Sequence, residues 1–318
     1  MNRRRSQDLR ALNELRISRG YFPSSSPSGV DVMTGHSFLF IRDLPLRIMP
    51  MGHGIDKKSW SVSLEPTGAP DLTEWIATLL DVGRYGRPGL PSALSAFIEE
   101  ITRELAYNGE TYYEIVTEGS GVPTPAHLLS LPFGRVRKRR DVFLQRVPDA
   151  DRDPGEPSEI EIPAAKILRL TLPAELGTPD EHRALLKELV KLSSSMPKFA
   201  LEGPELGKDS GYDFAAHHHV QEAAIERAMA KWGTVPSVRR LKGTTEYFFV
   251  VRTLQFARSQ ALIRAHLVGE LNLLLGRLGV ERTVVVRGLP TADAIGVAMD
   301  ALERGEMDFK AAMEVLEM

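Results

Sequence analysis

The chain contains no cysteine among its 318 residues. This absence excludes disulfide bonds, thiolate metal sites and cysteine nucleophiles, and it suits a cytosolic chain. No apolar run approaches the ~20 residues that a membrane-spanning helix needs. The basic N-terminus from Met1 to Arg5 is not followed by an apolar segment, so it does not form a secretory signal. We therefore expect no membrane partner.

A charge excess and the common enzyme motifs are also missing. The 40 lysines and arginines nearly balance the 42 acidic residues, and the formal net charge of -2 argues against a surface wholly devoted to nucleic acid. There is no Walker-type phosphate loop, no Gly-x-Ser-x-Gly elbow and no dinucleotide fingerprint. We therefore expect no enzyme activity and no cofactor. The remaining composition, 42% hydrophobic and 26% charged, is ordinary for a chain of one large or two modest domains.

The clearest local pattern is a helix followed by a strand. Apolar residues from Pro91 to Ala106 recur every three or four positions, which predicts an amphipathic helix. Asn108-Gly109 predicts its end, because both residue types tolerate the left-handed conformation of a helix C-terminus. The stretch from Thr111 to Val116 is aromatic and β-branched and reads as a strand with alternating faces.

Similar reasoning assigns the rest of the chain. Asp71 and Glu74 have the spacing of a capping box, which predicts a helix from Asp71 to about Asp81. Further strands are predicted in 37–51, 60–64, 135–139 and 283–287. Further helices are predicted from Thr178-Pro179 onward, over 214–231, over 246–278, and as a final pair at 291–299 and 308–317.

These elements predict an α+β fold in three consecutive segments. Residues 1–34 form a basic arm and linker, residues 35–175 a strand-rich mixed domain, and residues 176–318 a helical region with one long helix. The arm carries Arg3, Arg4 and Arg5. It is either a solvated terminus or an arm that contacts phosphates or a neighbouring subunit.

The helix, its glycine turn and the strand Gly109-Glu110-Thr111-Tyr112-Tyr113-Glu114-Ile115 resemble the wing region of tailed-phage portal proteins. The resemblance implies further strands at 125–132 and 161–170, in an order similar to that of the family, although Arg169 stands where the family often has a histidine. The resemblance covers about Leu72 to Leu172 and is looser elsewhere. The final helix pair is similar to the one that follows the stem in portals.

The resemblance implies a structural protein of a bacteriophage or prophage. A portal is a ring-forming homo-oligomer, commonly a dodecamer, and is the head–tail connector at one capsid vertex through which DNA is packaged and ejected. The implied partners are capsid, terminase and head–tail adaptor proteins, with weak and non-specific contact to double-stranded DNA. The implied location is the virion, and the host cytoplasm during assembly. This chain departs from the family because no clip domain is evident around Glu202–Arg240.

Two other functions stay open. The first is a helical oligomeric interaction or scaffold protein that does not handle DNA. The second is a metal-dependent helical enzyme, for which the cluster His217-His218-His219 is the starting point. Adjacent histidines on a helix point about 100° apart and cannot all bind one metal. The pairs His218 with Glu222 and His266 with Glu270 lack the Glu-x-x-His motifs of carboxylate-bridged sites. We expect no metal.

Two sets of residues are candidates for binding. The densest basic run offers possible DNA contacts, and in a strand its first, third and fifth members would share one face: Arg135, Arg137, Lys138, Arg139 and Arg140. The alternative is an exposed strand whose charge protects its edge from aggregation. On the long helix, Leu267 and Leu271 are the candidate subunit contacts.

Overall fold

The structure is a computed structural model that describes residues 43–45, 48–49, 60–66, 70–81, 89–117, 126–147, 157–187, 214–233 and 245–316. It is a mixed α and β protein, which confirms the predicted α+β class. The expectations for residues 1–42, including the basic arm, lie outside the described residues, as do most of those for 37–51.

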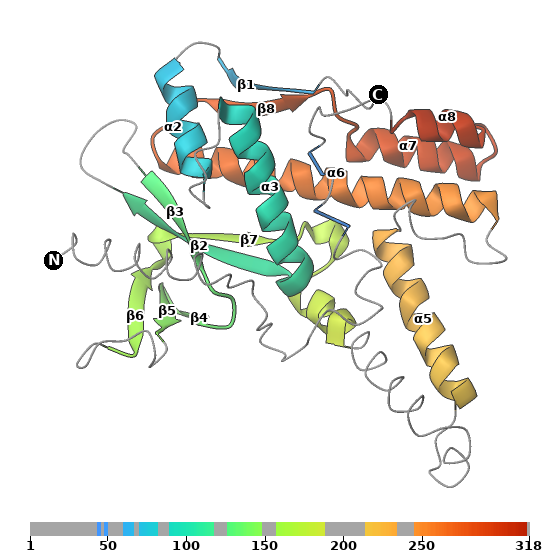
Figure 1. Cartoon of the computed structure of the whole chain (residues 1–318), viewed down its shortest axis with the longest axis horizontal. Coiled ribbons are helices and arrows are strands. Elements are labelled where there is room, and N and C mark those ends of the chain that lie inside the picture. Colours follow the sequence, from blue (N-terminus) through green and yellow to red (C-terminus); the bar gives the residue numbers. More distant parts are fainter. Residues whose placement is uncertain are drawn as a thin grey trace, which may run out of the picture. The chain divides into compact units, whose positions relative to one another are not determined.

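The chain forms two compact units, and neither is one continuous stretch. Figure 1 labels the helices and strands that belong to them. The mixed unit contains the described residues of 60–171 and 267–287. The helical unit contains the described residues of 43–49, 172–266 and 288–316. The three predicted segments therefore follow changes in residue composition along the chain, and their boundaries differ from those of the two units.

The mixed unit contains a two-stranded sheet whose strands are far apart in the sequence. Strand β1 (Ser61–Glu65) pairs antiparallel with β8 (Thr283–Arg287). The Asn272 side chain fixes β8, because its amide donates to the Val284 carbonyl at 3.1 Å and its oxygen accepts from the Val284 N–H at 2.7 Å. Both strands were predicted, but their pairing was not.

Helices α2 (Pro70–Leu80) and α3 (Gly89–Asn108) follow. The α3 prediction is confirmed: its apolar face is fully buried, and Gly109 ends it at a φ of 77° with its N–H donating to Leu105. The predicted capping box on α2 is wrong, because the helix already starts at Pro70 and Asp71 lies inside its first turn. Proline fits a first helical position, where its missing N–H has no partner to lose.

The first three-stranded sheet has the order β3-β2-β7 and is antiparallel throughout. Its central strand is β2 (Glu110–Thr117), flanked by β3 (Ala126–Leu131) and β7 (Ile167–Thr171). The single strand expected over 161–170 is wrong. A 3₁₀ turn at Ala164–Lys166 divides that stretch between two sheets.

The second sheet has the order β4-β5-β6. It contains β4 (Val136–Arg139), β5 (Val142–Arg146) and β6 (Glu159–Pro163). Phe143 and Ile162 pack with Tyr112, Leu131 and Ile167 of the first sheet in one apolar cluster. The hairpin between β4 and β5 turns at Arg140, whose φ is 53°. That left-handed conformation costs a residue with a Cβ atom roughly 1–2 kcal/mol.

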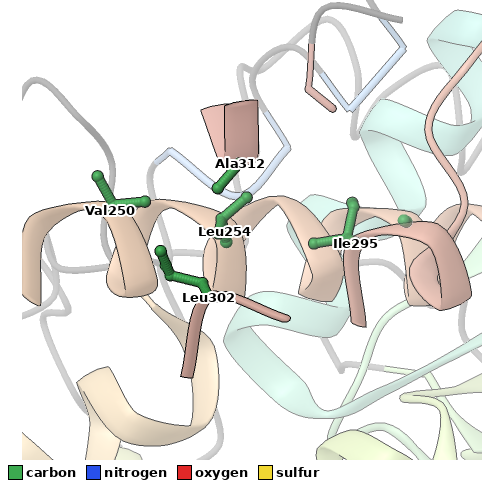
Figure 2. Close-up of a cluster of buried hydrophobic side chains, with 6 residues drawn as sticks. Val250, Leu254, Ile295, Leu302 and Ala312 are labelled. Carbon is green, nitrogen blue, oxygen red and sulfur yellow. The ribbon is translucent and has the colours of Figure 1, made fainter. Parts of the chain in front are cut away.

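The helical unit contains α5 (Phe214–Trp232), α7 (Ala292–Glu303), α8 (Phe309–Glu314) and the part of the long helix α6 (Glu246–Arg277) up to residue 266. These helices were predicted. Figure 2 shows the core in which α6, α7 and α8 meet, made of Val250, Leu254, Ala261, Ile295, Leu302 and Ala312. Thr291 and Asp308 cap α7 and α8 by accepting the N–H groups of Ala294 and Ala311.

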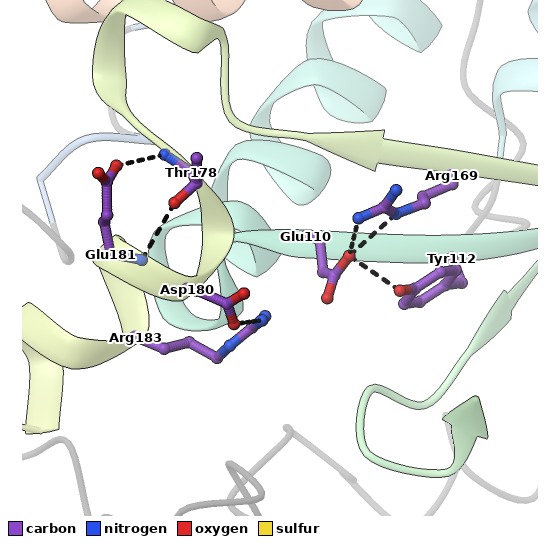
Figure 3. A network of polar contacts seen from close by, with 7 residues as sticks. All are labelled: Glu110, Tyr112, Arg169, Thr178, Asp180, Glu181 and Arg183. Carbon is purple, nitrogen blue, oxygen red and sulfur yellow. Dashed lines mark hydrogen bonds and ion pairs between the residues drawn. The ribbon is translucent and has the colours of Figure 1, made fainter. Parts of the chain in front are cut away.

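A capping box does occur, at the predicted helix start after Thr178. The Glu181 carboxylate accepts the Thr178 N–H at 2.8 Å, and the Thr178 hydroxyl accepts the Glu181 N–H at 3.3 Å (Figure 3). This exchange satisfies two N–H groups that the first turn leaves without partners. The hydrogen bonds from Thr178 lower the pKa of Glu181. In the same helix, whose described residues are 179–187, His182 is buried edge-on against Trp232 of α5.

Candidate functional site

The basic run lies on β4 and the turn that follows it. Arg137, Lys138, Arg139 and Arg140 are exposed, whereas Arg135 is partly buried just before the strand and has contacts of its own. Alternation along the strand places Arg137 and Arg139 on one face. The structure therefore brings the five predicted residues together at one edge of the β4-β5-β6 sheet.

Arg137 is held by an acid within this sheet. Its guanidinium lies 2.9 Å and 3.1 Å from the two carboxylate oxygens of Glu159 on β6. Because β5 lies between β4 and β6, this ion pair bridges the two edge strands. Leu144 is the β5 neighbour of Arg137 and is only 3% exposed, although it lies on this charged face. The charge of Arg137 is therefore locally balanced.

The tip of the hairpin differs. In the described part of the chain, the side chains of Lys138, Arg139 and Arg140 make no ion pair or hydrogen bond. Three consecutive cations are therefore exposed without a partner, and the exposed Asp141 that follows them in the turn offsets only part of their positive charge. Such a group can attract a polyanion, and it can also keep an edge strand from pairing with another chain.

A second polar cluster lies on the β3-β2-β7 sheet. One carboxylate oxygen of Glu110 accepts from Tyr112 at 2.8 Å and from two guanidinium nitrogens of Arg169 at 2.8 Å and 3.0 Å (Figure 3). Burial and the neighbouring Glu110 raise the pKa of Tyr112 to about 12. Burial lowers the pKa of Arg169, but the hydrogen bond and charge of Glu110 outweigh it and the pKa is raised. This cluster joins β7 to β2 and is already satisfied.

A third polar group, Glu104, was missed by the sequence reasoning. Its carboxylate accepts from the hydroxyls of Thr111 and Tyr113, the latter at 3.2 Å. Burial raises its pKa to about 7, and the nearby charge of Glu100 adds to this effect. The available signal was its position on α3 between Ile101 and Leu105, both fully buried.

The histidine cluster contributes no assembled site to the part of the chain that is described. There, no three histidine or acidic side chains are grouped so that they could hold a metal ion. His219 and Glu222 of α5 are exposed, and the side chains of His217 and His218 lie outside the described residues. His266 is partly buried, and its Nε2 atom has no hydrogen-bond partner within the described structure.

The candidate subunit contacts on α6 are interior residues of the single chain. Leu267 is 1% exposed and Leu271 is 2% exposed, so burial within one chain accounts for both without a second subunit. Other apolar side chains of α6 are exposed, notably Phe248 and Leu273. Each helix within the described residues is too short or too polar to cross a lipid bilayer.

Comparisons with known proteins give distant structural likenesses. No model of a known protein family matches the chain, and no curated protein sequence matches it. One solved structure, "Virion of native gene transfer agent (GTA) particle", contains a similar chain of 14% identity. The similarity covers 86% of each chain with a TM-score of 0.46.

A second similar chain comes from "Neck of empty GTA particle computed with C6 symmetry". It is 14% identical, with 74% of this chain and 82% of that chain covered and a TM-score of 0.39. Similarity at this level assigns neither an activity nor a partner to this chain.

Proposed function

We propose that this chain is a portal-like structural protein that assembles into a ring and forms a head–tail connector through which duplex DNA passes. The observation that supports this proposal is the series of elements that starts at α3. That helix ends at the left-handed Gly109, the aromatic strand β2 follows, and strands β3 to β7 come next in the chain. Long α6, β8 and the pair α7–α8 complete the order whose sequence resembles that of portals.

In this proposal, neighbouring subunits meet at the exposed face of α6. Leu273 is 65% exposed, whereas Leu271 and Leu274 of the same helix are buried. Gly269 and Gly276 lie on the same stretch, and a Cβ atom at either position would have no neighbour within 4 Å. Helix-interior glycines destabilise a helix by roughly 0.5–1 kcal/mol each. Glycine at these two positions would allow the backbone of a second chain to approach α6 closely.

The test of assembly is imaging of the purified full chain by mass photometry and negative-stain electron microscopy. Rings are expected, and a protein that stays monomeric at every concentration would contradict the proposal. Leu273→Asp should break the ring without unfolding the chain, because it places an unpaired carboxylate in the contact. Val297→Asp is the matched control, since Val297 is equally exposed at 66% but lies on α7. If the two variants behave alike, the contact does not involve Leu273.

The DNA-handling part of the proposal has its own test. Ring-shaped protein should bind duplex DNA weakly and without sequence preference, and the affinity should fall steeply as salt rises. Rings that bind no DNA even at low salt would favour the alternative, an oligomeric interaction protein. Contacts with capsid, terminase and adaptor proteins, and the location in the virion, belong to the same proposal.

A further inference from the structure

We propose that the β4–β5 hairpin tip, namely Lys138, Arg139 and Arg140, is the group that contacts DNA phosphates, whereas Arg135 and Arg137 serve the sheet itself. This inference rests on the proposed function, since it assumes that the chain handles duplex DNA. It divides a run of five cations that the sequence presents as one group.

The first observation that supports the division is the pairing of charges. Arg137 lies against Glu159, so its positive charge is already balanced by a carboxylate of the same sheet. Arg135 is partly buried and has contacts of its own. The three tip side chains have no ionic or hydrogen-bonding partner among the described residues, so they can bind phosphate without first breaking an internal pair.

The second observation is the backbone conformation of Arg140. A two-residue hairpin turn needs left-handed residues, and glycine, asparagine or aspartate adopt this conformation most readily. Here the residue with a φ of 53° is an arginine. Strained positions of this kind cluster at functional sites, where the surrounding structure holds them in place. The positive charge of Arg140 at the tip is a function that such a position can serve.

Edge protection explains the tip less well than phosphate binding does. Charges protect an edge strand when they lie along the strand and oppose its pairing with another chain. The last residue pair of the β4–β5 ladder is Arg139 with Val142. Arg140 lies beyond that pair, so its charge adds little protection to β4. Lys138 and Arg139 can serve both purposes.

A single tip offers only a few phosphate contacts. Linking several weak sites in one assembly raises their combined affinity far above that of one site. In a ring each subunit presents one tip, so contacts that are weak in one chain act together on one duplex. The resulting binding is independent of sequence, because phosphates carry no base information.

The experiment measures binding of the full chain to a fluorescent duplex of mixed sequence over a salt series. Arg140→Asn and Arg137→Gln each remove one positive charge from neighbouring positions, so they form a matched pair. Arg140→Asn should weaken binding and lower the slope of log affinity against log salt by about 0.9 for each phosphate that the variant no longer neutralises. Arg137→Gln should leave the slope unchanged, and Arg140→Lys should retain binding.

Thermal unfolding of the same variants separates a binding effect from damage to the fold. Asparagine tolerates the left-handed conformation, so Arg140→Asn should raise the midpoint of unfolding by about 2–4 °C while it weakens DNA binding. Equal loss of binding by Arg137→Gln and Arg140→Asn would overturn the inference but leave the proposed function intact. Unchanged binding by Arg140→Asn would do the same. A wild-type chain that binds no duplex at low salt would overturn both the inference and the DNA-handling role.

Discussion

The two three-stranded sheets of the mixed unit use charged residues in opposite ways. In the β3-β2-β7 sheet, Glu110 and Arg169 form a cross-strand pair whose carboxylate is 9% exposed. In the β4-β5-β6 sheet, Arg137 and Glu159 also form a pair, but their side chains are 67% and 41% exposed. One pair is therefore shielded from water on its acidic side, and the other is solvated on both.

This difference assigns different roles to charge in one unit. Few unpaired charges are tolerated where water is excluded, so the buried carboxylates of Glu110 and Glu104 depend on neighbouring side chains for hydrogen bonds. Glu110 has Arg169 and Tyr112, and Glu104 has Thr111 and Tyr113. On the β4-β5-β6 sheet, water solvates the unpaired cations, so the hairpin tip can keep them available for a partner. Substitutions around β2 should therefore change stability more than substitutions on β4.

The largest expected effect is the dependence of stability on pH that Glu104 of α3 produces where it contacts Thr111 and Tyr113 of β2. Its pKa is raised from 4.5 to about 7, so the folded state favours the protonated carboxyl. The stability that this group contributes is fully present below pH 4.5 and is lost as the pH rises through about 7. The loss amounts to about 3 kcal/mol at most.

The measurement compares the wild-type chain with Glu104→Gln by denaturant unfolding across this pH range. The amide mimics the protonated carboxyl, so the stability of the variant relative to the wild type should increase as the pH rises. Subtracting the two curves removes the titration of all other groups. A difference that stays constant with pH would show that Glu104 has the same pKa in the folded and unfolded states, which contradicts the prediction.

The next largest effect concerns the shielded ion pair. Arg169→Met removes the cation and leaves the Glu110 carboxylate with Tyr112 as its remaining partner among the contacts in Figure 3. The expected loss is about 2 kcal/mol in the free energy of unfolding, because Glu110 is desolvated while half of the Arg169 side chain still reaches water. Chemical denaturation at neutral pH measures it. A loss within error of zero would mean that water replaces the guanidinium freely.

Local signals explain which parts of the fold could be predicted from the sequence. Helices α3 and α6 repeat apolar residues at helical spacing and end at Gly109 and Gly279, both with positive φ. Strands β2 and β8 are dense in residues that favour strands. A helix cap or a strand face depends on residues within a few positions of each other, so it is visible in one sequence.

The features that could not be predicted depend on contacts between residues far apart in the chain. β1 meets β8 from the other end of the sequence, and the stretch 161–170 divides because its halves pair with different strands. The basic run was identified as a group. The sequence could not separate its paired members from its free ones, because Glu159 lies 22 residues after Arg137. The left-handed Arg140 was hidden for another reason, since arginine is not a residue type that signals such a turn.

The smallest expected effect completes the comparison. Arg137→Met removes the outer ion pair and retains an unbranched apolar side chain beside Leu144. Exposed ion pairs typically contribute about 0.2–1 kcal/mol, so the free energy of unfolding should fall by less than about 0.5 kcal/mol. Arg169→Met is the same substitution on the β3-β2-β7 sheet. The ratio of the two losses in unfolding free energy measures how strongly burial changes the contribution of an ion pair to stability. High salt should reduce the small loss further, because screening acts on exposed charges. Arg137→Met could instead destabilise the chain as much as Arg169→Met does. The Arg137–Glu159 pair would then be essential for holding β4 to β6, and the contrast between the two sheets would not hold.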